Sequence, residues 1–223
     1  MIARRLAEVR AAIDAACEEA GRPTGSVQLV AVSKTFPVEA VREAQRAGQV
    51  HFGESYAQEL RDKARELPGV AWHFIGRLQT NKARYVAPVA HRVHALETVE
   101  QAEALSRRLD RPLRCLVSVN VGGEETKGGV APPRALDRCA ELSRVPNIEI
   151  VGLTCLPPWR EDPEDVAPFF EELASLATDG RARGLPLHEL SMGMSHDFRV
   201  AIRHGATWVR VGTAIFGERP PAR

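Results

Sequence analysis

Long apolar runs are absent from this chain of 223 residues, and none approaches the roughly 20 residues that a membrane-spanning helix needs. Residues 1–23 carry charges throughout, which excludes the uninterrupted apolar segment of a secretory signal. We therefore expect a cytoplasmic protein with no membrane partner.

Excess charge of one sign is also absent, because 30 Lys and Arg residues face 29 Asp and Glu residues for a net charge of +1. With only 5% aromatic residues as well, the chain has neither the positive field nor the stacking side chains that nucleic acids need, and we expect no nucleic-acid partner. An RNA-binding or partner-docking role of the Arg-rich helices is the minor alternative. The few cysteines form no CxxC pair and are expected to be small buried residues: Cys17, Cys115, Cys139 and Cys155.

Strand-like β-branched runs alternate with helical stretches along the chain, after an amphipathic opening helix at 2–20. The predicted strands are 27–33, 50–53, 72–75, 91–96, 113–119, 148–153, 187–190 and 207–211. The predicted helices between them are 38–47, 56–67, 81–86, 99–109, 134–144, 164–177 and 198–204. This alternation predicts an α/β fold, a closed (β/α)8 TIM barrel with an extra N-terminal helix, as one domain over 1–223. An open doubly wound sheet is the rival, but its GxGxxG turn is missing after the first strand.

Lysine is scarce, since the 30 basic residues include only four lysines, and Lys34 follows the apolar run LVAVS. Functional groups of a barrel gather at the carboxyl ends of its strands, where desolvation lowers the pKa of an amine and suits it to form a Schiff base. A rim lysine that simply extends into water is the alternative. Ser195, Gly212 and Thr213 lie after the last two strands, the usual phosphate position in this fold. Together these residues predict a ligand with a carbonyl and a phosphate.

Arg210 is predicted to point into the barrel just before the Gly-Thr turn, as a buried cation that needs a partner. Beside a pyridine ring it would donate to the ring nitrogen, which would then stay unprotonated. An ion pair with Glu218 or another carboxylate is the alternative.

Other polar residues give weaker predictions. Glu54 would be the proton shuttle if the protein were a Schiff-base aldolase or phosphosugar enzyme. A metal hydrolase is disfavoured, because His91 and His94 are expected to point to opposite faces of one strand. The histidines in general are expected to lie at strand ends and on the surface. Lys63 and Lys82 are predicted to be surface charges. The Gly-rich loop that contains Glu124, Glu125 and Lys127 is predicted to be either a mobile lid over the pocket or a solvated turn.

Several blocks of the chain, from about Val27 to Arg219, resemble the pyridoxal phosphate homeostasis protein family, the single-domain relatives of the alanine racemase barrel. These blocks are LVAVSKTFPVEAVREA, HFGES, WHFIGRLQTNKAR, GGEETKGG and ELSMGMSHDFRVAIRHGATWVRVGTAIFGER. The resemblance implies a fold-type III barrel that binds pyridoxal 5'-phosphate (PLP). It implies that Lys34 forms the Schiff base, that Ser195, Gly212 and Thr213 contact the phosphate, and that Arg210 faces the pyridine nitrogen.

The resemblance further implies a PLP carrier or regulator of vitamin B6 balance without substantial turnover, with PLP-dependent apo-enzymes as recipients. Alanine racemase-like enzymes add a tyrosine from a second domain, and since this chain ends at Arg223 we expect at most weak racemase activity and a monomer. The chain departs from the family pattern at Ser55, a cofactor-binding position where the family usually has Asn, and also at Thr154, Cys155 and His196.

Overall fold

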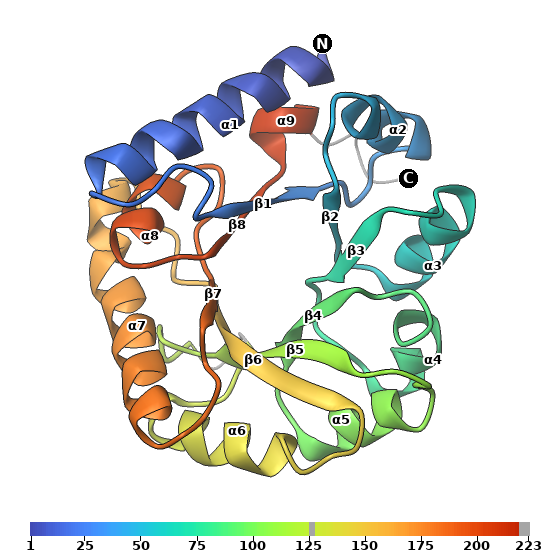
Figure 1. The fold of residues 1–223 in the computed structure, drawn as a ribbon, viewed down its shortest axis with the longest axis vertical. Coiled ribbons are helices and arrows are strands. Elements are labelled where there is room, and N and C mark those ends of the chain that lie inside the picture. Colours follow the sequence, from blue (N-terminus) through green and yellow to red (C-terminus); the bar gives the residue numbers. More distant parts are fainter. Residues whose placement is uncertain (125–127, 219–223) are drawn as a thin grey trace.

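The computed structural model describes residues 1–124 and 128–218, and within these ranges eight parallel strands form a closed barrel in sequence order (Figure 1). The strands are β1 (Gln28–Val32), β2 (His51–Glu54), β3 (Ala71–Phe74), β4 (Arg92–Leu96), β5 (Leu113–Val119), β6 (Ile148–Cys155), β7 (Glu189–Ser191) and β8 (Trp208–Val211). The predicted (β/α)8 barrel is therefore confirmed, and the open doubly wound alternative is excluded because β1 pairs with β8.

Helices cover the outside of the barrel and begin with α1 (Ile2–Glu19), the predicted extra N-terminal helix. The others are α2 (Val38–Arg46), α3 (Ala57–Glu66), α4 (Ala83–Val86), α5 (Val99–Ser106), α6 (Ala135–Leu142), α7 (Ala167–Ala182), α8 (Phe198–Arg203) and α9 (Thr213–Phe216). Short 3-10 helices precede three of them: η1 (Thr80–Lys82), η2 (Pro132–Arg134) and η3 (Pro163–Val166). None of the helices in the described part of the chain is long and apolar enough to cross a membrane.

The helix α1 packs on α8 and α9, beside the closure between β1 and β8 (Figure 1). Its buried side chains recur at helical spacing: Leu6, Val9, Ile13, Ala16 and Cys17. Burying each of the larger ones stabilises the fold by about 1.5–3 kcal/mol. The N-terminal helix thus covers the outer side of the strands that carry Lys34 and Arg210.

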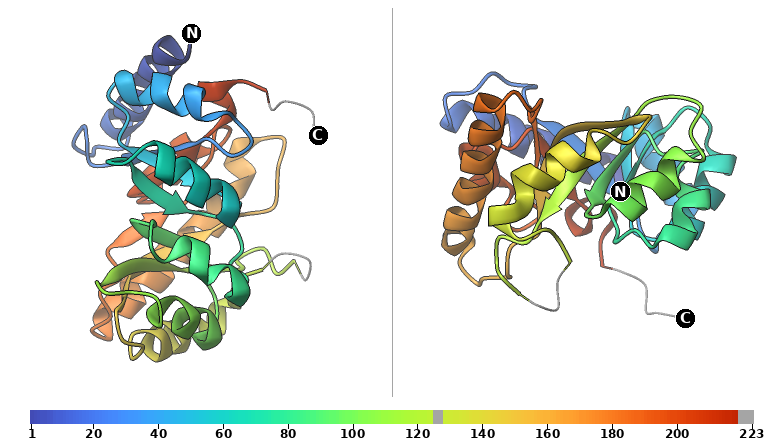
Figure 2. Two further views of the ribbon diagram at one scale, coloured as in Figure 1. Left: turned by 90° about the vertical axis from the view of Figure 1, so that its right-hand side faces the viewer. Right: turned by 90° about the horizontal axis from the view of Figure 1, so that it is seen from below.

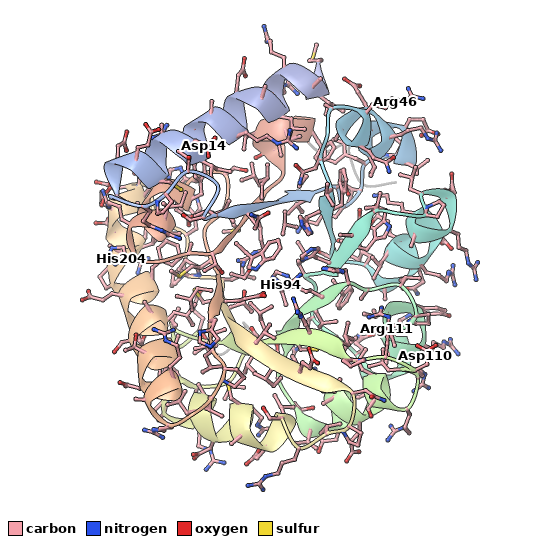
Figure 3. All side chains as sticks on the ribbon, viewed as in Figure 1. Asp14, Arg46, His94, Asp110, Arg111 and His204 are labelled. Carbon is pink, nitrogen blue, oxygen red and sulfur yellow. The ribbon has the colours of Figure 1, made fainter. Side chains whose placement is uncertain are left out.

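Side chains alternate between the two faces of the strands. Outward residues such as Leu29, Phe52 and Val209 belong to the apolar core between barrel and helices. The barrel interior is instead rich in polar groups, and His94 projects into it from β4 (Figure 3). The inward face of the strands therefore buries charged and imidazole groups together, whereas the outward face is apolar.

The loops that follow the carboxyl ends of β5 and β6 protrude on the same side of the barrel (Figure 2). Gly152 allows β6 to approach β7 closely, because a Cβ at this position would overlap the carbonyl oxygen of Glu189. This close packing of neighbouring strands brings their carboxyl ends together around one opening.

Candidate functional site

A cavity of about 500 Å³ opens at the carboxyl ends of the strands. All six residues predicted as cofactor-binding line it, although they come from four different strand ends: Lys34, Ser55, Ser195, Arg210, Gly212 and Thr213. Barrel closure is the cause, because it places the turn after β8 beside the turn after β1. The structure thus brings the whole predicted set to one place.

Lys34 follows β1 and is half-buried at the cavity wall. The next residue, Thr35, has a φ of 69°, a left-handed conformation that is costly for a β-branched residue. The surrounding structure must stabilise this turn, and the turn sets the direction in which Lys34 leaves the strand.

A hydroxyl-rich corner lies on the same wall. The hydroxyl groups of Ser195 and Thr213 are 3.2 Å apart, and the backbone N–H of Gly212 donates to Ser195 Oγ at 3.4 Å. A Cβ on Gly212 would lie 3.1 Å from the carbonyl oxygen of Val32, so glycine keeps this turn close to β1. Hydroxyl and amide donors gathered around a small turn are suited to an anion.

Arg210 is buried with 6% exposure, as predicted, and its guanidinium donates to groups on β6 and β7. Nη1 contacts the hydroxyl of Thr154 at 3.0 Å and both the carbonyl and the hydroxyl of Ser191 at 2.6 Å, and Nη2 donates to the carbonyl of Cys155 at 2.8 Å. The ion pair considered with Glu218 is wrong, because Glu218 is exposed and no carboxylate among the described residues pairs with Arg210. Burial lowers the pKa of this guanidinium.

The neutral partners leave part of the guanidinium free for a ligand. An arginine has five N–H donors, and Nε of Arg210 makes no hydrogen bond to any described residue. Since Arg210 lines the cavity, an acceptor held there is within the reach of its remaining donors.

A row of histidines runs through the barrel interior to this arginine. His51 Nδ1 lies 3.0 Å from His73 Nε2, His73 Nδ1 lies 2.8 Å from His94 Nε2, and His94 Nδ1 lies 2.8 Å from the hydroxyl of Ser191. Burial lowers the pKa of His51 to about 4 and the pKa values of His73 and His94 well below the ordinary value. These imidazoles are therefore neutral hydrogen-bonding groups at neutral pH.

The sequence-based placement of the histidines is corrected by this row. His73 and His94 are buried inside the barrel rather than exposed. His91 and His94 do not lie on opposite sides, since both rings have centroids within 5.7 Å of the His73 ring. His91 precedes β4, so strand alternation does not apply to it. The alternation WHF, with two large apolar residues outward, was the signal that places His73 inward.

Lys63 and Glu54 also differ from the predictions. Lys63 is not a surface charge but has 6% exposure, and its ammonium pairs with Glu54 at 2.7 Å and with Glu59 at 2.8 Å. Glu54 faces α3 and does not line the cavity, so it is not placed to shuttle protons there. Burial raises the pKa of Glu54 to about 7 against the opposing effect of Lys63. Lys82 is half-buried beside the ring of Tyr85.

The positions that depart from the family pattern all line the cavity. The hydroxyl of Thr154 donates to the carbonyl of Ser191 at 2.7 Å, which orients the hydroxyl oxygen of Thr154 to accept from Arg210. The carbonyl of Cys155 accepts from the same arginine. His196 is exposed at the mouth and stacks on Trp159. Two further lining residues, Arg77 and Glu97, were not singled out from the sequence, and their place after strand ends was the available signal.

The predicted lid is only partly described. Glu125, Lys127 and also Arg219 lie outside the described residues, and the lid stays a prediction. The flanking residue Gly128 lines the cavity. All four cysteines are buried free thiols, as predicted. No group of three or more His, Cys, Asp or Glu side chains within 1–124 and 128–218 is arranged to hold a metal ion.

Comparison with known proteins gives concordant matches. The family model described as alanine racemase, N-terminal domain matches residues 5–220. The pyridoxal phosphate homeostasis protein of Aquifex aeolicus is 43% identical over 221 residues, which are 96% of this chain and 97% of that protein.

Two solved structures have the same fold and similar length. A protein from Bifidobacterium adolescentis, described only as an unknown protein, has a TM-score of 0.90 at 33% identity, over 96% of this chain and 94% of that one. PipY of Synechococcus elongatus with PLP bound has a TM-score of 0.83 at 35% identity, over 97% of this chain and 100% of that one.

Proposed function

Because the chain belongs to the pyridoxal phosphate homeostasis protein family, we propose that it binds pyridoxal 5'-phosphate and takes part in the intracellular homeostasis of this cofactor. The PLP-bound structure of PipY supports the choice of ligand. The observation that carries the proposal is that a lysine amine, a hydroxyl-rich turn and a buried arginine line the same cavity. Its volume of about 500 Å³ is that of a small-molecule site.

The residues fit the cofactor. Ser195, Gly212 and Thr213 supply hydroxyl and backbone donors for the phosphate, and Lys34 supplies the amine for a Schiff base. Ser55 also lines the cavity, with a shorter side chain than the usual Asn of the family. When bound, PLP would supply a reactive aldehyde and an electron-accepting ring.

Arg210 favours storage of the cofactor over catalysis. An arginine donates a hydrogen bond but does not give up its proton, so a ring nitrogen beside it stays unprotonated and withdraws electrons weakly. The four hydrogen bonds to neutral groups hold this guanidinium in place. We therefore propose a carrier or regulator with little turnover of its own.

The residues that the enzymatic alternatives would use as a second acid or base do not line the cavity. A racemase would use a tyrosine, but Tyr56 is largely exposed and Tyr85 stacks beneath Arg61 and Arg84, and neither lines the cavity. An aldolase or phosphosugar enzyme would use Glu54, which pairs with Lys63 on the other side of β2.

The test is the visible absorbance of the purified protein, followed by borohydride reduction and peptide mass mapping. We expect a yellow protein whose reduced adduct maps to Lys34, a colourless Lys34→Ala variant, and a Lys82→Ala variant that remains yellow. A wild-type protein that stays colourless with added PLP, or an adduct that maps elsewhere, would contradict the proposal.

We further propose that the protein acts as a monomer in the cytoplasm and passes PLP to PLP-dependent apo-enzymes. The four free thiols suit a reducing compartment. Light scattering tests the monomer. Direct transfer is tested by the rate at which the loaded protein reactivates an apo-enzyme. A rate above that of free PLP at the same concentration would support direct transfer, and a rate equal to it would contradict it.

A further inference from the structure

Lys63 on α3 is a buried lysine outside the cavity. Its ammonium donates three hydrogen bonds, to the carbonyl of Ser33 at 2.8 Å, to Glu54 Oε1 at 2.7 Å and to Glu59 Oε1 at 2.8 Å. An ammonium has three hydrogens, so its capacity is fully used. Such a complete set of short bonds fixes the ammonium at one point between α3 and the end of β1.

These bonds enclose the turn that carries Lys34. On its N-terminal side, Ser33 is held twice, through its carbonyl by Lys63 and through its hydroxyl, which donates to Glu54 Oε1 at 2.7 Å. On its C-terminal side, the backbone N–H of Thr35 donates to Glu59 Oε1 at 2.8 Å. Both chain neighbours of Lys34 therefore donate hydrogen bonds to carboxylates, and the ammonium of Lys63 donates to both of these carboxylates.

The attachment matters because the turn is strained. Thr35 adopts a φ of 69°, which a threonine rarely adopts without compensation. Thr35 itself is exposed, so side-chain packing does not hold it. The backbone N–H of Phe36 closes the turn by donating to the carbonyl of Ser33 at 3.1 Å, and the bond from Thr35 to Glu59 is the side-chain contact that adds to it. Glu59 is in turn oriented by Lys63.

We propose that Lys63 is a positioning residue that, through Glu54 and Glu59, holds the turn Ser33–Thr35 so that Lys34 points into the cavity. The proposal rests on the proposed function for the role of Lys34. Removing the ammonium would leave two carboxylates side by side, at least one of them buried, without a counter-charge. Glu54 would take up a proton in response, and Glu59 would lose the donor that orients it toward Thr35, which would release the turn.

The experiment compares Lys63→Met, Lys63→Arg and Lys82→Met with the wild-type protein in the apo form and with added PLP. Hydrogen exchange measured by mass spectrometry on peptides that cover residues 33–38 reports the turn without any ligand. We expect faster exchange there in Lys63→Met, a PLP dissociation constant raised at least tenfold and partial recovery in Lys63→Arg. Lys82→Met should match the wild-type protein in both measurements.

A folded Lys63→Met variant with wild-type exchange at residues 33–38 would overturn the proposal, and so would one that binds PLP within twofold of the wild-type affinity. If Lys63→Met does not fold, Glu59→Gln decides, since Glu59 is more exposed than Lys63. We expect it to speed exchange at the amide of Thr35 and to weaken PLP binding at least threefold, and unchanged values would overturn the proposal. A wild-type protein that fails to bind PLP would contradict the proposed function alone, because the exchange measurement still tests the turn.

Discussion

The hydroxyl oxygen of Ser191 lies 2.8 Å from Nδ1 of His94 at the centre of the barrel. The same oxygen accepts a hydrogen bond from Arg210 at 2.6 Å, and an arginine cannot accept one in return. Within the described residues, His94 is therefore the acceptor available to the hydroxyl hydrogen of Ser191. This places a lone pair on Nδ1 of His94 and its proton on Nε2.

The direction of the hydrogen bond from Ser191 to His94 also fixes the direction of the hydrogen bonds along the histidine row, which gives a prediction for NMR. If His94 Nε2–H donates to His73, then His73 Nε2–H must donate to Nδ1 of His51. We expect all three imidazoles as neutral Nε2–H tautomers in nitrogen-15 spectra at pH 7.5. A His94 that carries its proton on Nδ1 would contradict this, and Ser191→Ala should release the preference.

Stability should fall as the pH drops below about 6.5. In the folded protein burial depresses the pKa values of His73 and His94, so between their folded values and the ordinary value the unfolded chain binds more protons. Each contributes up to about 1.4 kcal/mol per pH unit in this range. His51, whose pKa burial lowers to about 4, acts in the same direction. Glu54, with its pKa raised to about 7, acts in the opposite direction as the pH falls from 7 to 4.5, and cancels about the contribution of one histidine.

Chemical denaturation between pH 7.5 and 5 measures this dependence. We expect the free energy of unfolding to decrease with acidification, with a smaller slope in His94→Gln and an unchanged slope in His188→Gln, whose side chain is exposed. A protein that becomes more stable from pH 7 to 5 would show that these buried imidazoles do not control its acid stability.

The order of the elements and the position of the site were accessible from the sequence. Runs such as LVAV and LRCLVSV predict strands locally, and the rule that barrel residues act at strand ends then joins Lys34 to Thr213 without any local signal. The alternation of side chains between the two faces of a strand was sufficient to predict that Arg210 points inward.

Buried charge was not accessible, because it depends on partners far away in the chain. Lys63 is buried because the turn 30 residues earlier and two carboxylates meet it in space. Likewise, Arg92 pairs with Glu189, 97 residues later. A helical pattern predicts which side of α3 faces the barrel, but not that a lysine there finds acceptors for all its hydrogens.

Gly152 should tolerate no side chain. A Cβ there would overlap the carbonyl oxygen of Glu189 on β7, and backbone in a barrel cannot move aside cheaply. We expect Gly152→Ala to destabilise the protein by about 3 kcal/mol or more in urea denaturation. Gly184→Ala is the matched control, because Gly184 has a φ of +81° but no atom near its Cβ position, and should cost only about 1 kcal/mol. Equal effects of the two variants would contradict the steric explanation.

Arg210→Lys tests whether the forked shape of the guanidinium, rather than its charge, holds the carboxyl ends of β6 and β7 together. The two terminal nitrogens reach the carbonyl of Cys155 and the groups of Ser191 and Thr154 at once, which a single ammonium cannot do. Each buried acceptor left without a donor costs about 1–3 kcal/mol, so we expect a loss of roughly 2–4 kcal/mol in the free energy of unfolding. Arg114→Lys, at an exposed arginine on β5, should change it by less than about 0.5 kcal/mol. If both variants unfold at the same urea concentration as the wild-type protein, charge alone is sufficient at position 210. In that case the forked shape would matter only for the ligand that the cavity holds, and a stability difference between the Arg210→Lys and Arg114→Lys variants should appear when they are compared with PLP present.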